Sequence, residues 1–199
     1  MGCSNSKQDV GENVVKVSNT KYSFLPFTSE YLKQDDNTIT AITTQNSSTA
    51  VIDMKISKSI WRCELIFHKS TVDRFIGFVD GSFEVPSFYW AGSDNHSVGF
   101  SGPNGHVYHN GKSTEGAHPF ADDVKVKVEI NMESQPRQAF FFVDDEQQDV
   151  HICNLPEEVY FCGSLLIPDS SFEVLSVVNV PHESQAKPTP NSTPIEWEH

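Results

Sequence analysis

Gly2 and Cys3 have the types and spacing that suit enzymatic acylation. Once Met1 is removed, Gly2 becomes the N-terminus, and Ser6 and Lys7 follow at positions that fit the N-myristoylation pattern. The thiol of Cys3 is a natural acceptor for a palmitoyl group. An accidental match by an ordinary polar terminus is the alternative. The agreement of all four residues favours two acyl chains and a membrane anchor.

The second lipid matters because a single myristoyl chain gives only marginal, reversible membrane binding. The usual substitute is a polybasic patch, but residues 1–33 hold four lysines against three carboxylates. We therefore expect residues 1–20 to be a flexible tether, lipidated at Gly2 and Cys3. This tether would hold the protein at the cytoplasmic face of a membrane, in particular the plasma membrane.

Histidines and aspartates between residues 94 and 123 suggest a metal site, but their spacing does not fit one. His106 and His109 are three residues apart, so on a strand they would point to opposite faces. We expect turn and strand-end histidines here, with no metal and no cofactor.

Nucleophilic catalysis has weak support. Ser101 lies in a partial GxSxG pattern that lacks the final glycine spacing and a following helix. His151 would share a strand face with Cys153, which makes this the best enzyme-like pair in the chain. The apolar neighbours of Cys153 argue against a reactive thiolate. A cysteine-dependent hydrolase is therefore a minor alternative, and we expect no enzyme activity.

Length and composition narrow the class of protein further. The 199 residues suit one domain with tails, and the net charge of −13 repels phosphate backbones, so we expect no nucleic-acid partner. The apolar runs are far shorter than the roughly 20 residues of a membrane-spanning helix. Cys63, Cys153 and Cys162 lie in apolar runs without a CxxC pair, which indicates buried thiols in a reducing compartment.

The elements that must position any site are strands. Val124, Val126 and Val128 alternate with polar residues, a period of two that indicates half-buried strands, and no convincing amphipathic helix is present. Many short strands separated by turn residues predict an antiparallel sandwich. The expected strands lie within residues 37–44, 50–56, 61–67, 74–79, 88–90, 97–100, 106–109, 124–130, 139–143, 149–153, 159–166 and 172–178.

The C-terminal residues 181–199 are rich in proline and polar side chains, which predicts a disordered tail. Thr189 and Thr193 each precede a proline and are candidate phosphorylation sites. Such dipeptides are common in disordered tails, so the favoured interpretation is an incidental match.

A cluster of aromatic residues within 80–90 is the best candidate for a binding surface. Phe83, Phe88 and Tyr89 would offer large contact area at low entropic cost, and we predict that they bind a partner. The alternative is that Phe88 and Trp90 face the core while Phe83 and Tyr89 cover it.

Two neighbouring segments resemble the central run of the B30.2/SPRY domain family. They are Ser97-Val98-Gly99-Phe100 and Gly105-His106-Val107-Tyr108-His109-Asn110-Gly111. Segments similar to other family motifs occur in the family's order, upstream at 60–65 and 74–79 and downstream at 123–131, 137–143, 155–160 and 172–175. The sequence departs from the family at 144–146 and 161–163.

This resemblance covers residues 38–179 and implies an all-β, bent antiparallel sandwich with little helix, which we expect over residues 21–180. It also implies a non-catalytic module that binds a protein or peptide ligand through its loops, without a small-molecule cofactor. With the lipid anchors, such a module would be a membrane-tethered scaffold or adaptor. A carbohydrate-binding sandwich of lectin-like architecture is the main alternative.

Overall fold

The computed structural model describes residues 21–27, 30–42, 47–180, 184 and 186–198, and over these residues the chain is built from strands and loops. None of the described residues belongs to a helix long and apolar enough to cross a membrane. Fourteen strands are present in the described part: β1 (Leu32–Asp35), β2 (Thr38–Ala41), β3 (Ser48–Val51), β4 (Ile60–His68), β5 (Arg74–Asp80), β6 (Ser97–Ser101), β7 (Val107–His109), β8 (Lys112–Thr114), β9 (Lys125–Asn131), β10 (Gln138–Val143), β11 (Glu146–Cys153), β12 (Val159–Leu165), β13 (Ser171–Val180) and β14 (Thr193–Glu196).

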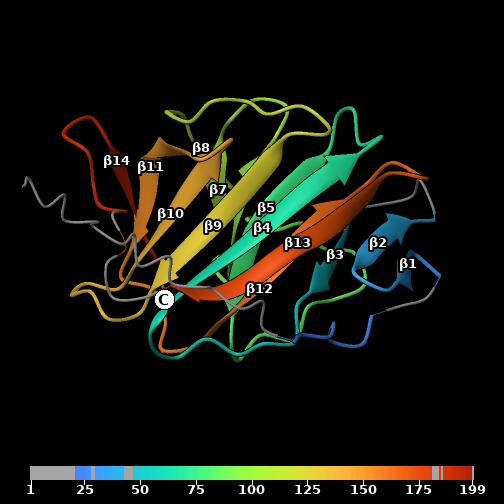
Figure 1. Cartoon of the computed structure of the whole chain (residues 1–199), viewed down its shortest axis with the longest axis horizontal. Helices are drawn as coiled ribbons and strands as arrows, with labels where there is room; N and C mark the ends of the chain where they lie inside the picture. The colour runs from blue at the N-terminus through green and yellow to red at the C-terminus, as the bar shows by residue number, and fades with distance from the viewer. Residues whose placement is uncertain (1–20, 28–29, 43–46, 181–183, 185, 199) are drawn as a thin grey trace, which may run out of the picture.

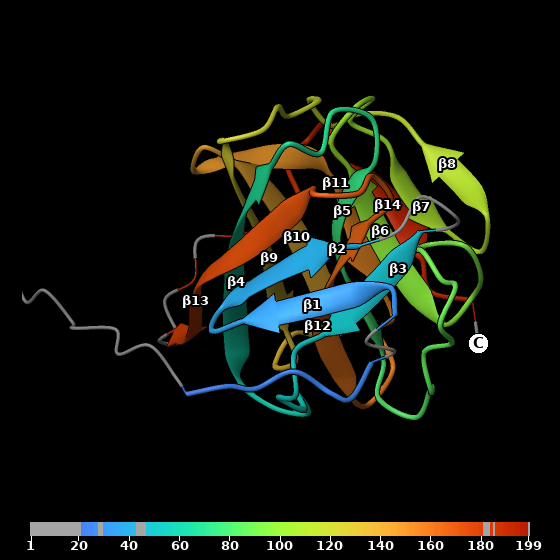
Figure 2. The same ribbon diagram turned by 90° about the vertical axis from the view of Figure 1, so that its right-hand side faces the viewer.

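The strands form two sheets that face each other (Figures 1 and 2). The larger sheet has the order β1-β2-β13-β4-β9-β10-β11-β14, and the smaller has the order β3-β12-β5-β6-β7-β8. Every strand pair is antiparallel except β11 with β14, which is parallel. This arrangement confirms the predicted all-β antiparallel sandwich.

The core lies between the sheets and follows from the period-two pattern. In β4, Cys63, Leu65 and Phe67 point inward and are fully buried, as their alternation predicts. Trp61 is in the same phase but only half-buried, because it lies near the start of the strand. Phenylalanine fills much of the interior, with Phe67, Phe78, Phe100, Phe141, Phe161 and Phe172 almost completely enclosed.

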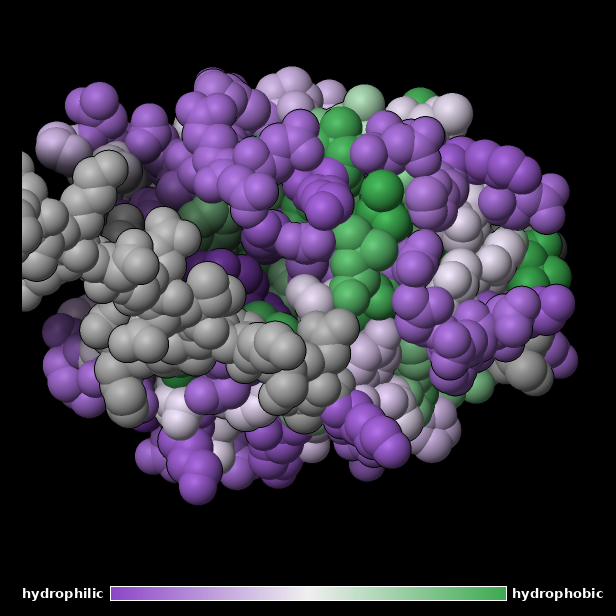
Figure 3. Space-filling model, viewed as in Figure 1, coloured by the Kyte–Doolittle hydropathy of each residue, from purple (hydrophilic) through white to green (hydrophobic). Residues whose placement is uncertain are grey.

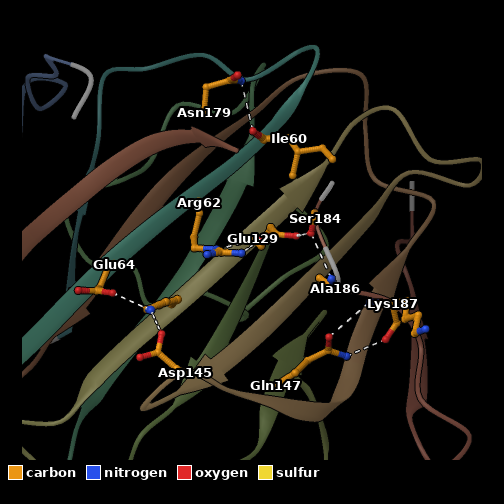
Figure 4. Close-up of polar contacts among 11 residues, drawn as sticks. Ile60, Arg62, Glu64, Glu129, Asp145, Gln147, Asn179, Ser184, Ala186 and Lys187 are labelled. Atoms are coloured by element: carbon orange, nitrogen blue, oxygen red, sulfur yellow. Dashed lines mark hydrogen bonds and ion pairs between the residues drawn. The ribbon is translucent and has the colours of Figure 1, made fainter. Parts of the chain in front are cut away.

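The outer face of the larger sheet shows hydrophilic surface around a central band of hydrophobic surface (Figure 3). Glu129 on β9 is fully buried there, because Arg62 donates to its carboxylate and Ser184 donates to its other oxygen. Lys127 forms ion pairs with Glu64, at 2.9 Å, and with Asp145, and both carboxylates are labelled in Figure 4. These ion pairs explain how polar residues of β9 become buried on the outward face.

The strongest departure from expectation is at the C-terminal end. Composition predicts a disordered tail, yet β14 pairs with β11, and Trp197 is only 5% exposed. The prediction of disorder is therefore wrong for residues 193–197. An apolar pair, Ile195 and Trp197, packs on the core, and the abundance of proline in the sequence concealed this short pattern. Residues 88–90, expected to be a strand, form none, while β1 and β8 were not expected.

Candidate functional site

A groove of about 690 Å³ opens on the outer face of the smaller sheet, at the end where β5 finishes. Its floor includes Thr49 and Val51 of β3 and Tyr160 of β12. One wall is the connection after β5, residues 81–87, and the other is formed by residues 25–27 and 31–32. Segments far apart in the sequence therefore build the groove together.

The long β5–β6 connection is held on the sheet by apolar packing. Val85, Trp90 and Ala91 pack against Phe75 and Val79, which β5 points to the outer face. The backbone approaches β6 so closely that a Cβ atom on Gly99 would lie 2.0 Å from the carbonyl oxygen of Ala91. Only glycine fits at this position. The Ser97–Ser101 segment, which resembles a family motif, therefore lets the β5–β6 connection pack closely on the sheet.

Tyr89 anchors this connection from inside. Its side chain is 6% exposed, and its hydroxyl lies 2.5 Å from Asp94 and 2.7 Å from Ser97. Burial, followed by the hydrogen bond to Asp94, raises the pKa of the Tyr89 phenol. Its main-chain oxygen accepts a 2.7 Å hydrogen bond from Thr49. Tyr89 therefore offers almost no surface to a partner, and the structure assigns it a supporting position.

Phe88, by contrast, points outward. It is 46% exposed, and its ring lies 4.6 Å from that of Tyr31. Ile42, 49% exposed, follows β2, and its amide donates a 2.9 Å hydrogen bond to the carbonyl of Tyr31. We call the ring pair of Tyr31 and Phe88 the aromatic rim.

Phe83 belongs to the groove itself and is half-buried. Its ring stacks on His96 at 4.4 Å and contacts the ring of Tyr89 at 5.2 Å. Phe83 and Phe88 thus border one surface, with Tyr89 beneath it. Partner binding by these residues stays a prediction. Sequence reasoning missed Tyr31, because nothing in its local pattern indicates that the fold would bring it beside Phe88.

The charge around the groove is mixed. Glu84 in one wall is exposed, and Lys55 pairs with Glu158 at 2.7 Å near the Tyr160 ring. The hydrogen bond to Glu158 raises the pKa of Lys55, so this ammonium stays charged. The lining combines apolar side chains with hydroxyl groups of serine and threonine. Its one carboxylate, Glu84, has no ion-pair partner among the described residues.

The enzyme-like residues do not assemble. Burial raises the pKa of the Cys63, Cys153 and Cys162 thiols, which opposes thiolate formation. His151 directs its Nδ1 atom to the Ser192 hydroxyl at 2.9 Å. Cys153 instead lies 3.9 Å from the amide nitrogen of Gln138. Over the described part of the chain, no group of three or more His, Cys, Asp or Glu side chains is placed to hold a metal ion.

The predicted lipidation residues, Gly2 and Cys3, lie outside the described residues. The same holds for the whole tether, residues 1–20. Their acylation therefore stays a prediction from the sequence.

Comparisons with known proteins bear on the fold. No family model matches the sequence, and no curated protein matches it. The SPRY domain of human HERC1 superposes with a TM-score of 0.61 at 12% identity, covering 77% of this chain and 98% of that one. The chain has the SPRY fold. The TRIM65 PSpry domain agrees, with a TM-score of 0.58 at 10% identity over 79% of this chain and 89% of that one.

A further human SPRY domain gives a TM-score of 0.58 at 12% identity, covering 72% of this chain and 94% of the other. These superpositions confirm the fold that the motifs around Gly99 and Gly105 predict. At such low identity the comparisons describe architecture, and the ligand must be argued from the groove.

Proposed function

We propose that this chain is a non-catalytic interaction module whose groove binds an extended peptide of a partner protein. The observation that carries the proposal is the aromatic rim beside the groove. Large exposed apolar side chains next to an apolar concavity are typical of interaction sites, and aromatic residues are enriched among those that dominate binding energy. Here Phe88 and Tyr31 border a groove whose walls are anchored from below by Tyr89.

The groove also suggests the chemistry of the peptide. Its apolar lining, from Leu25, Phe27 and Val85, suits an apolar anchor side chain. Glu84 adds a carboxylate without an ion-pair partner in the described chain, which favours a basic residue beside the anchor. The net charge of −13 acts in the same direction, because it attracts basic partners over a longer range.

We further propose that acyl chains on Gly2 and Cys3 hold this module on a membrane, so that it acts as a scaffold or adaptor there. Support comes from the sequence pattern of residues 2–7 and from the weak membrane affinity of a single acyl chain.

Selection from a random peptide library against the full chain tests the groove. Selected peptides should share an apolar residue next to a basic one. Phe88→Ala should weaken their binding at least fivefold, which is about 1 kcal/mol. Val72→Ala is the matched control, since Val72 is 58% exposed and lies just before the opposite end of β5. Equal binding by both variants would move the site elsewhere, and selective binding to a glycan array would favour the lectin-like alternative.

A further inference from the structure

Residues 186–198, the C-terminal strap, lie along β11 at one end of the larger sheet. The strap begins with a reciprocal contact: the side-chain amide of Gln147 donates to the carbonyl of Lys187 at 2.7 Å and accepts from its amide at 3.3 Å (Figure 4). Ser192 then contacts His151 at 2.9 Å. Side chains of β11 thus hold the strap before it forms β14.

The far end of the strap is anchored in the core. Trp197 stacks on Phe78 with ring centres 5.8 Å apart, and the amide of Glu198 donates a 3.0 Å hydrogen bond to His109. The part between Lys187 and Ser192 has no such anchor. It is irregular up to a turn at residues 190–191, and Pro188, Pro190 and Asn191 are exposed. Figure 1 shows this segment as a red loop that projects beside β14.

One side chain fastens that loop. The hydroxyl of Thr189 donates a 2.7 Å hydrogen bond to the carboxylate of Asp149, an exposed residue of β11. Pro190 follows, so the Thr-Pro sequence lies on a loop whose other residues are largely exposed, while Thr189 itself is half-buried by its contact with β11. Thr193 also precedes a proline, but its hydroxyl makes no hydrogen bond within the described chain.

We propose that Thr189 is a phosphorylation site for a proline-directed kinase, and that a phosphate there detaches the loop 186–192 from β11 while Trp197 remains anchored. The kinase transfers the γ-phosphoryl group of ATP to Thr189 Oγ1. A new O–P bond forms, the bond between the γ-phosphorus and the β,γ-bridging oxygen breaks, ADP leaves, and the hydroxyl proton is released.

The electrostatics favour detachment. Phosphorylation removes the donor that bonds Asp149 and adds a charge of about −1.5 to −2 next to that carboxylate. Among the described residues Asp149 has no ion pair with a lysine or arginine, so no cation contact at this carboxylate compensates for the added charge. Even with the dielectric constant of water, Coulomb's law at about 4 Å gives a repulsion large enough to shift the docking equilibrium roughly tenfold or more.

Phosphothreonine installed at position 189 or at position 193 of the full chain tests this, with hydrogen exchange read by mass spectrometry. Phosphothreonine at 189 should speed exchange in peptides covering 186–192 about tenfold, while β5 and β12 keep their protection. The same modification at 193 should change these peptides less than about twofold. Asp149→Asn should restore most of the protection in the chain phosphorylated at 189.

Three results would overturn the proposal. One is unchanged exchange with phosphothreonine at 189, and another is an equal increase with either modification. The third is preferential phosphorylation of Thr193 when the unmodified full chain is incubated with ATP and a recombinant proline-directed kinase. The side chain of Thr193 is exposed, but its backbone is paired with β11 in β14, whereas Thr189 lies on an unpaired loop.

Discussion

Replacement of Trp197 by alanine should destabilise the whole domain. Trp197 lies in the apolar core, stacked on Phe78 and with its ring 4.8 Å from that of His109. Alanine would leave a large cavity at this end of the sandwich. The composition of residues 181–199 suggests a disordered tail, which would tolerate Trp197→Ala without loss of stability. The structure leads to the opposite expectation.

The size of the effect follows from the burial of the indole. Truncating a buried tryptophan costs about 3–5 kcal/mol, from lost apolar burial and the cavity left behind. If the strap of the variant detaches from the sheet, the rest of the domain can stay folded. The loss of unfolding free energy therefore cannot greatly exceed the free energy of strap docking. We therefore expect the lower value, about 3 kcal/mol, which for a domain of this size lowers the melting temperature by roughly 6–12 °C.

Thermal and urea unfolding of Trp197→Ala, followed by circular dichroism, measures this loss. Lys112→Ala is the control, because it removes only the exposed ion pair with Glu198 and should change stability little. Deletion of residues 186–199 should cost at least as much as Trp197→Ala. A Trp197→Ala protein that melts within about 1 °C of the wild type would refute the docked position of the strap.

Three further predictions concern acidity, the loop anchor and the membrane. Burial lowers the pKa of His109, whose Nε2 atom accepts from the amide of Glu198, so strap docking should be complete above pH 6.5 and weaken as the pH falls through the lowered pKa. Hydrogen exchange of residues 193–198 at pH 7 and pH 5 checks this, and equal protection would contradict it. Tyr89→Phe should cost about 1–3 kcal/mol of unfolding free energy by leaving Ser97 and Asp94 without their phenol partner, measured by urea unfolding. An unchanged urea midpoint would contradict the supporting role of Tyr89 and favour its role in partner binding. Gly2→Ala should move the protein from the membrane fraction to the soluble fraction of cells, and retention on membranes would exclude the lipid anchor.

Much of the sandwich can be predicted from the sequence, because the alternation of apolar and polar residues that forms each strand is local. Alternation in residues 61–67 and 124–130 determines which side chains point inward, and β4 and β9 form where this pattern lies. The buried pair Phe140 and Phe141 likewise follows from a run that is apolar on both faces. Short edge strands such as β1 and β8 carry no such pattern, since little of their surface is buried.

The candidate site is less readable, because it depends on contacts between distant segments. The sequence predicts a partner-binding aromatic cluster within residues 80–90, and this stays a prediction. The sequence does not predict the groove beside these residues or which of the aromatic side chains are exposed. Exposed Phe88 and buried Tyr89 are adjacent, and only the hydrogen bonds of Tyr89 to Asp94 and Ser97 decide which one faces inward. The pairing of Tyr31 with Phe88 needs the three-dimensional fold.

Amide chemical-shift mapping with a library-selected peptide tests most directly whether the groove beside the aromatic rim binds a peptide. The largest shifts should fall in residues 25–27, 31–32, 48–51 and 81–88, and Phe88→Ala should abolish them at the same peptide concentration. Shifts centred on β11 and the strap, or on the outer face of β4 and β9, would contradict peptide binding in the groove.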